Sequence, residues 1–259
     1  MKIRVSVLLL ALLLPLGLVA GCSGDDDPEP ASGPGLPSQA DLLSYFEAIT
    51  GADPDGLARA QSDIAAGGSP AQGYAAYVSE FSAAAAAAGQ APDPVDVEEV
   101  DGGFKACIGD SPDQCATWSD LEGKDGRLTD FAINDVGLDD LLVDLTAQQP
   151  IESPGLYVVQ PRWAYLQPKS GTLNVVLTIT ADAAALSPKP GIYIEEEQLL
   201  EGTKTTSPAT IEAGTSSPVV LAFPDAQDVK LDGQITFDLG LQGAGNESIG
   251  FGLADPTAP

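Results

Sequence analysis

Histidine is absent from this chain of 259 residues. The absence excludes Ser-His-Asp and Cys-His catalysis and any histidine-ligated metal site. Basic residues are scarce, since 11 Lys and Arg stand against 38 Asp and Glu, which gives a net charge of −27. Nucleic acid and anionic lipid headgroups repel such a chain, so we expect no nucleic-acid partner. The acidic residues are spread along the sequence, a pattern typical of solubility rather than of a cation site.

No cofactor, metal site or catalytic residue is predicted from the acidic segments. The run Asp120–Gly126 has the spacing of a calcium loop, but Lys124 stands where the third oxygen ligand is needed. Asp120 and Asp130 flank predicted strands and are expected to be exposed to solvent. General acid–base catalysis needs a positioned group with a tuned pKa, and neither carboxylate meets that requirement. The run Glu195–Glu197 is expected to end an exposed strand or loop, with a binding role as the alternative.

Long hydrophobic runs are also lacking after the N-terminus. The stretch Val5–Ala20 contains a proline and a glycine and is shorter than the ~20 residues that a spanning helix needs, which disfavours a transmembrane anchor. Lys2 and Arg4 precede it, and Leu18–Cys22 closes it with small residues before a cysteine, the lipobox pattern of a bacterial lipoprotein signal. We therefore predict lipid on Cys22, which would anchor the protein to the cell membrane on the extracytoplasmic face.

Only three cysteines are present. With Cys22 carrying lipid, Cys107 and Cys115 are the remaining pair, in a compartment where disulfides persist. A bridge between them would close the base of a hairpin and contribute ~2 to 3 kcal/mol. A redox-active pair is the alternative, but the spacing is not C-x-x-C, and Lys105 is the one basic residue near enough to lower a thiol pKa.

Composition divides the chain into segments. Removal of the signal takes Lys2 and Arg4 and leaves 9 basic and 38 acidic residues, a net charge of −29. The stretch that follows is rich in Asp, Pro and Gly and spans on the order of 20 Å as a coil. Proline and glycine around residues 149–155 indicate a second boundary. The predicted organisation is a signal peptide over 1–21, a disordered tether over 22–37, a first domain over 38–148, a second over 156–254 and a tail over 255–259.

Helical signals dominate the first domain as far as residue 90. Ser38 with Asp41 suits a capping box, and Asp53-Pro54 and Ser69-Pro70 are N-cap and N1 pairs that open two further helices. Apolar residues recur at helical spacing in the first helix, at Leu42, Tyr45, Phe46 and Ile49. Alternating apolar residues then predict a four-stranded antiparallel meander over Val95–Val100, Phe104–Ile108, Cys115–Leu121 and Arg127–Ile133.

Helical periodicity disappears after residue 155. Seven strand candidates separated by turn residues are typical of an immunoglobulin-like β-sandwich. They are Arg162–Leu166, Thr172–Thr180, Gly191–Glu195, Ala209–Glu212, Pro218–Phe223, Gln234–Leu241 and Ser248–Leu253. The predicted fold class is therefore an α+β N-terminal domain, with three helices on a curved four-stranded sheet, followed by an all-β sandwich.

The helices and meander, from residue 38 to about 146, resemble the nuclear transport factor 2-like (NTF2-like, or SnoaL-like) cone fold. The segment Gly123–Asn134 is similar to a strand-opening motif of that family. Taken whole, with Trp163–Tyr165 before Gly171–Leu177, the chain resembles two-domain bacterial lipoproteins in which such a domain precedes an immunoglobulin-like sandwich.

The resemblance implies a pocket between the helices and the bent sheet. Alternation along the strands and helical spacing together nominate its lining, at Tyr45, Tyr74, Tyr77, Phe104, Trp118 and Phe131. The aromatic face of the third helix also suits a packed core, which is the other interpretation of Tyr74 and Tyr77. We expect a surface-tethered binding or interaction module for an unknown small molecule or envelope protein. A small-molecule lyase or isomerase of the cone-fold type is the alternative, and a structural role in the envelope stays open.

Overall fold

The computed structural model of the chain describes residues 33–90, 95–108, 114–196 and 198–254. The predicted signal peptide, Cys22, residues 22–32 of the predicted tether and the tail over 255–259 lie outside these ranges. None of the helices within the described ranges combines the length and the hydropathy needed to cross a bilayer.

The predicted helix caps are confirmed. Ser38, Asp53 and Ser69 each accept a hydrogen bond from the backbone N–H three residues further on, at 3.2, 2.7 and 3.2 Å. Each bond satisfies an N–H that has no partner within its helix. The helices are α1 (Gln39–Gly51), α2 (Pro54–Arg59), the π-helical turn η1 (Ala60–Ile64), α3 (Pro70–Ala87) and α4 (Leu138–Leu141).

The second predicted helix changes from α-helical to π-helical hydrogen bonding along its length. Its α-helical part ends at Arg59, and the chain continues as the π-helical turn η1. Arg127, on the first sheet, donates hydrogen bonds from its guanidinium to the carbonyls of Ser62 (2.7 Å) and Ala65 (3.2 Å). Since carbonyls at a helix end lack partners within the helix, this contact stabilises the turn against the sheet.

The first sheet is antiparallel, in the order β1-β2-β3-β4-β5. Its last two strands are joined by a two-residue turn in which Asn134 (φ 50°) and Asp135 (φ 66°) are both left-handed. Such a turn matches the twist of the strands it joins, and Asn and Asp tolerate it better than most residues. The strands are β1 (Val97–Val100), β2 (Gly103–Cys107), β3 (Cys115–Lys124), β4 (Arg127–Ile133) and β5 (Val136–Gly137).

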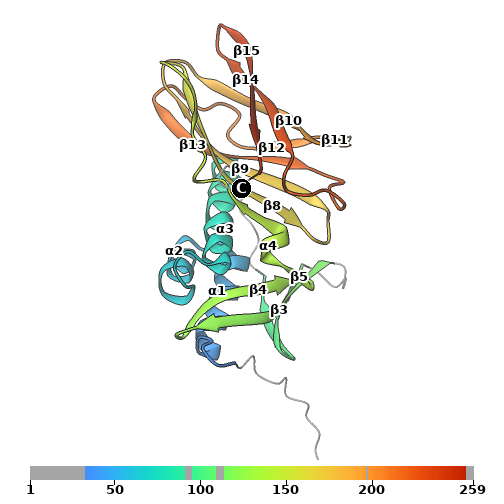
Figure 1. Cartoon of the computed structure of the whole chain (residues 1–259). Coiled ribbons are helices and arrows are strands. Elements are labelled where there is room, and N and C mark those ends of the chain that lie inside the picture. The colour runs from blue at the N-terminus through green and yellow to red at the C-terminus, as the bar shows by residue number, and fades with distance from the viewer. Residues whose placement is uncertain (1–32, 91–94, 109–113, 197, 255–259) are drawn as a thin grey trace, which may run out of the picture.

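The second half of the chain is a β-sandwich of two antiparallel sheets, drawn above the helices in Figure 1. One sheet has the order β11-β10-β14-β15, and the other has the order β12-β13-β9-β8-β6, with β7 also paired to β8. The strands are β6 (Leu142–Asp144), β7 (Ile151–Ser153), β8 (Tyr157–Gln167), β9 (Thr172–Ala181), β10 (Leu186–Glu195), β11 (Gln198–Glu201), β12 (Lys204–Thr206), β13 (Thr215–Phe223), β14 (Gln234–Leu241) and β15 (Gly245–Gly252).

The predicted fold class is wrong. The structure is mostly β, with three antiparallel sheets, 46% strand and 22% helix, so an NTF2-like α+β domain joined to a separate sandwich does not describe it. The first sheet has five strands, and β6, expected in the first domain, pairs with β8 of the six-stranded sheet. Buried side chains from the helices and all three sheets form one continuous core. Helical spacing predicted that the apolar residues of α3 lie on one face of the helix, but it could not predict which sheet would pack against that face.

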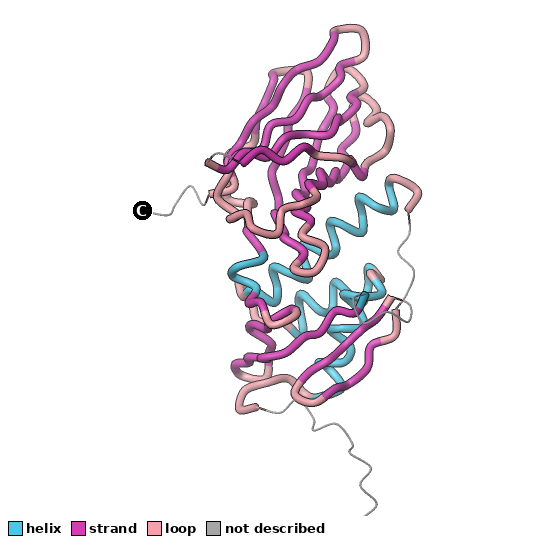
Figure 2. Tube along the Cα trace, turned by 90° about the vertical axis from the view of Figure 1, so that its right-hand side faces the viewer, coloured by secondary structure: helices cyan, strands magenta, loops and turns pink. Residues whose placement is uncertain are grey.

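Helix α3 connects the two parts of the molecule. It runs between the first sheet and the sandwich in Figures 1 and 2. Glu80 of α3 forms a bidentate ion pair with Arg162 of β8, whose Nη2 and Nε lie 2.7 to 3.1 Å from the carboxylate oxygens. The helix is therefore attached to the six-stranded sheet by a charge-assisted contact as well as by apolar packing.

Gly73 allows α3 to approach β8 closely. A Cβ at this position would lie 3.3 Å from Cζ3 of Trp163 and 3.5 Å from Cδ2 of Leu142. Glycine inside a helix costs about 1 kcal/mol relative to alanine. Here the glycine makes room for the Trp163 indole, which is 5% exposed.

The Cys107–Cys115 disulfide is confirmed. The two residues lie directly opposite each other where β2 pairs with β3, so the bridge closes the base of the hairpin as expected. Phe104, Ala106 and Trp118 are buried on the inner face of this hairpin. Ile108 was expected on the same face, but it lies beyond the end of β2, where the alternation stops, and is 69% exposed.

Candidate functional site

An aromatic cluster fills the space between α1 and the first sheet. The Phe46 ring lies 4.7 Å from that of Phe104, 5.1 Å from that of Trp118 and 5.5 Å from that of Phe131. Tyr45 packs against Phe46 and Phe131, and none of these five side chains is more than 3% exposed. Tyr45, Phe104, Trp118 and Phe131, which we expected to line a pocket, therefore lie in the core.

The polar end of Tyr45 is satisfied inside this core. Its hydroxyl donates a hydrogen bond to the carbonyl of Ala71 at 2.6 Å. Burial raises the pKa of Tyr45 well above its ordinary value, with a smaller contribution from Tyr74. A neutral, hydrogen-bonded phenol in this position holds α1 to the start of α3.

A groove of about 640 Å³ lies beside the cluster. It is bounded by the end of α1, one face of α3, the disulfide-closed hairpin, the end of β4 and the loop from β8 to β9. We call it the α3 groove. Tyr74 and Tyr77, two of the predicted pocket residues, line it, and Tyr165 of β8 joins them. Its volume lies within the ~300 to 1,000 Å³ typical of small-molecule sites.

Three tyrosines form the floor of the α3 groove. The ring of Tyr165 lies 5.4 Å from that of Tyr74 and 4.8 Å from that of Tyr77, and Tyr77 contacts Phe81 at 5.8 Å. Each tyrosine is at most 9% exposed, whereas Phe81 is partly exposed. The floor is thus a continuous aromatic surface contributed by α3 and β8.

The floor hydroxyls stay neutral at physiological pH. Burial is the main cause that raises the pKa of Tyr74 to about 12 and the pKa values of Tyr77 and Tyr165 well above the ordinary range. A hydrogen bond between the Tyr74 and Tyr165 hydroxyls lowers the pKa of Tyr74 in part. The floor can therefore donate and accept hydrogen bonds but carries no charge.

The remaining polar lining is neutral apart from one lysine. Uncharged amide and hydroxyl side chains surround the floor, at Thr50, Ser82, Gln90, Gln114, Asn134, Gln167 and Ser170. Lys169 is the charged residue among the described lining residues, and none of these is a carboxylate. In a chain with 38 acidic residues, the lack of a carboxylate among the described lining residues is a clear local departure from the overall composition.

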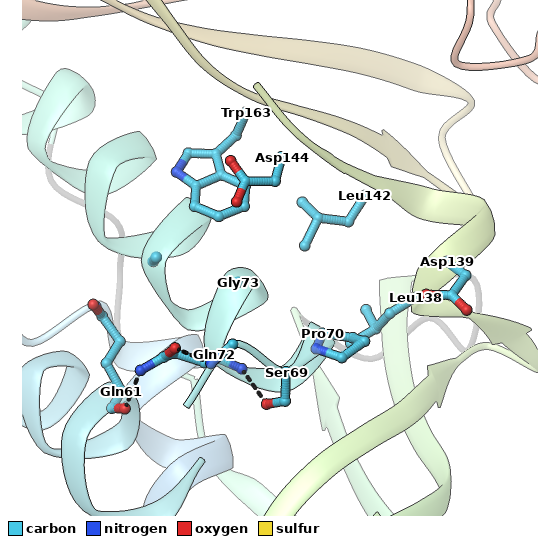
Figure 3. A pocket seen from close by; sticks show the side chains of 12 residues that line it. Gln61, Ser69, Pro70, Gln72, Gly73, Leu138, Asp139, Leu142, Asp144 and Trp163 are labelled. Atoms are coloured by element: carbon cyan, nitrogen blue, oxygen red, sulfur yellow. Dashed lines mark hydrogen bonds between the residues drawn. The ribbon is translucent and has the colours of Figure 1, made fainter. Parts of the chain in front are cut away.

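A second pocket, of about 330 Å³, lies at the N-terminus of α3 (Figure 3). Its polar groups already hold the local structure. The Gln72 amide accepts from the N–H of Gly68 at 2.7 Å and donates to the carbonyl of Gln61 at 3.0 Å. The Ser69 hydroxyl caps the helix, and Asp144 accepts from the N–H of Thr146 at 2.8 Å. Because these groups are occupied, the α3 groove is the stronger candidate site.

The acidic residues considered in the sequence do not form a site within the described ranges. No cluster of three or more Cys, Asp or Glu suited to a metal ion is found there. Partial burial and the nearby Asp139 and Glu122 carboxylates raise the pKa of Asp130, against a lowering hydrogen bond from the N–H of Phe131. Asp120 is exposed, and neither Asp120 nor Asp130 lines the α3 groove.

Glu195 differs from the expectation of an exposed acidic run. It is 9% exposed, and its carboxylate accepts a hydrogen bond from the N–H of Lys230 at 2.9 Å. Glu196 is exposed and left-handed, with φ 46°. Glu195 therefore anchors a loop of the sandwich.

Two residues of the α3 groove could not be found from the sequence. Tyr165 is read in the sequence as a sandwich strand residue, and nothing in local spacing joins it to Tyr74, 91 positions earlier. Asn134 follows a predicted strand, and its turn-forming tendency gives no sign of a groove. The helical spacing of Tyr74, Tyr77 and Phe81 was the available signal, and it left both a core face and a pocket lining open for the two tyrosines.

Comparison with known proteins gives no functional assignment. No protein-family model and no curated protein matches this chain. Among solved structures, the chain is similar to the crystal structure of the yeast GGA1_GAE domain-P21, with 8% sequence identity and a TM-score of 0.25. The match covers 41% of this chain and 99% of that one. At this TM-score the likeness carries no argument about fold or ligand.

Proposed function

We propose that this chain is a binding module, tethered to the cell envelope through lipid on Cys22, that holds an uncharged small molecule in the α3 groove. The observation that carries the proposal is the groove itself, with about 640 Å³ of space, an aromatic floor and no carboxylate within its described lining. Aromatic side chains combined with a few placed polar groups are the usual lining of ligand sites.

The groove chemistry supports binding rather than turnover. The floor tyrosines are neutral phenols because burial raises their pKa values. A general acid or base needs a pKa near the working pH, and these groups are far from it. The enzymatic alternative depended on an NTF2-like cone fold. Since the fold class is a different one, nothing further supports that alternative.

Ser82 offers a direct test of the groove. It is half-buried on α3 and lines the groove, whereas its neighbour Ala83 is exposed and does not. Ser82→Trp should fill part of the groove, and Ala83→Trp places the same side chain on the same helix outside it. We would measure the melting temperature of both variants and the unaltered chain with neutral probes, N-phenyl-1-naphthylamine and linear glucose oligosaccharides.

The proposal expects at least one of these probes to raise the melting temperature of the unaltered chain and of Ala83→Trp by several degrees. Ser82→Trp should lose that shift, because the indole occupies the space that the probe needs. Equal shifts in all three proteins, or no shift with any probe, would overturn the proposed function.

A further inference from the structure

The rim of the α3 groove presents neutral hydrogen-bonding groups that the protein does not use. The Asn134 carbonyl oxygen accepts from the backbone N–H of Thr117 (3.1 Å) and from its hydroxyl (3.2 Å). Because a backbone N–H can only donate, these contacts fix the oxygen on the Thr117 side, and the amide nitrogen is the other end. That nitrogen has no protein partner within the described residues.

The amide of Gln167, at the end of β8, likewise has a donor that the protein does not use. Its carbonyl oxygen accepts from the Ser170 hydroxyl at 2.8 Å, and no partner within the described part of the chain accepts from its amide nitrogen. Both residues line the groove, one from the end of β4 and one from the end of β8. Two separate strand ends therefore bring neutral N–H donors to the lining of the groove.

These groups limit the chemistry of the ligand. Covering an unsatisfied donor with an alkyl chain costs about 1 to 3 kcal/mol for each group, so a purely apolar ligand fits poorly. A cationic ligand meets no carboxylate among the lining residues that the structure describes. An anionic ligand is opposed by the net charge of −27 on the chain.

We infer that the α3 groove takes a neutral carbohydrate, an inference that rests on the proposed function and names its ligand class. A pyranose ring has C–H faces that pack on aromatic rings and a rim of hydroxyls that accept and donate hydrogen bonds. Phe81 and the tyrosine floor provide the aromatic contact, and Asn134 and Gln167 provide the neutral donors. The aromatic floor and the two neutral amide donors thus match the two kinds of surface that one sugar ring offers.

Asn134→Asp tests this inference with a small change. Aspartate tolerates the left-handed backbone at this position and can still accept from Thr117, but it has no N–H to offer a sugar hydroxyl. Asn246→Asp is the matched control, since Asn246 is an exposed residue of β15 outside the groove and the change in net charge is the same. Calorimetric titration of the full chain with α- and β-linked glucose oligosaccharides gives the dissociation constants.

We expect an oligosaccharide to bind the unaltered chain and Asn246→Asp equally, and to bind Asn134→Asp about tenfold more weakly. Equal weakening in both variants would overturn the assignment of the Asn134 donor. If no oligosaccharide binds while N-phenyl-1-naphthylamine binds in a way that Ser82→Trp abolishes, the carbohydrate inference fails and the proposed function stands. If neither kind of probe binds, both fail.

Discussion

Asn134 combines two roles in one residue. Its left-handed backbone, with φ 50°, forms the turn from β4 to β5, and its side chain lines the α3 groove while bonding to Thr117. Asparagine is among the residues best suited to this conformation, so the residue that forms the turn can also supply the amide N–H donor of the groove. Substitution at this position therefore needs a residue that keeps the turn, as aspartate does.

Cys22 carries the prediction about location. Replacing it with serine removes the thiol to which the lipid would be attached, so Cys22→Ser should leave the chain in the aqueous fraction after membranes are sedimented. The unaltered chain should sediment with membranes and be released by detergent. If Cys22→Ser remains with the membranes, the lipid anchor is wrong.

At the scale of elements, α3 is the part on which the site depends. It contributes Tyr74, Tyr77 and Phe81 to the groove, and its position is set by Gly73 against Trp163 and by the Glu80–Arg162 pair. A displacement of α3 would separate the tyrosines of the helix from Tyr165 of β8. The contacts that attach the helix to the sandwich thus also position the groove floor.

Removal of the Glu80–Arg162 pair should have a measurable effect on stability. Glu80→Gln leaves the guanidinium of Arg162 without its carboxylate in a site where the two side chains are 24% and 33% exposed. We expect the free energy of unfolding to fall by about 1 to 2 kcal/mol, measured by urea denaturation.

The Arg59–Asp41 pair is the control for that measurement. Its side chains are 56% and 42% exposed, and the contact is a single one at 3.2 Å. Arg59→Gln should change the free energy of unfolding by less than about 0.5 kcal/mol, as exposed pairs usually do. Similar losses for the two variants would show that the Glu80–Arg162 pair does not fix the helix.

Elements were easier to predict from the sequence than their assembly. The caps at Ser38, Asp53 and Ser69 and the disulfide hairpin follow from local chemistry, because cap side chains and strand alternation act over a few residues. The pairing of β6 with β8 and the approach of Tyr165 to Tyr77 depend on contacts far apart in sequence. Local periodicity carries no information on such contacts, so the fold class and the place of Tyr165 in the groove floor could not be derived.

At the scale of the whole molecule, the tyrosines share one property. The chain has six, and all of them have pKa values above the ordinary range, with burial as the largest cause. For Tyr74 and Tyr193 the pKa reaches about 12. Folding thus keeps every phenol of the protein protonated beyond the pH at which a free phenol ionises.

This property predicts how stability depends on pH. The unfolded chain loses its phenol protons near pH 10, as free tyrosine does, while the folded chain holds them to about pH 12, as for Tyr74. Between these pH values the folded chain binds more protons than the unfolded chain. Tyrosine ionisation should therefore leave the free energy of unfolding unchanged below about pH 10 and should lower it between about pH 10 and 12.

Tyrosinate absorbance at 295 nm measures this directly. In the native protein the absorbance should rise only together with the loss of near-ultraviolet circular dichroism, well above pH 10. In concentrated guanidinium chloride it should rise with a midpoint near the ordinary tyrosine pKa of about 10. A native titration with that ordinary midpoint would contradict the described burial of the tyrosines.

Binding of a neutral ligand in the α3 groove can be measured through the dissociation constants of neutral glucose oligosaccharides for Ser82→Trp and Ala83→Trp. We expect Ala83→Trp to bind like the unaltered chain and Ser82→Trp to bind at least about tenfold more weakly. Equal affinity of the two variants for a bound oligosaccharide would place the binding site elsewhere and contradict binding in the α3 groove.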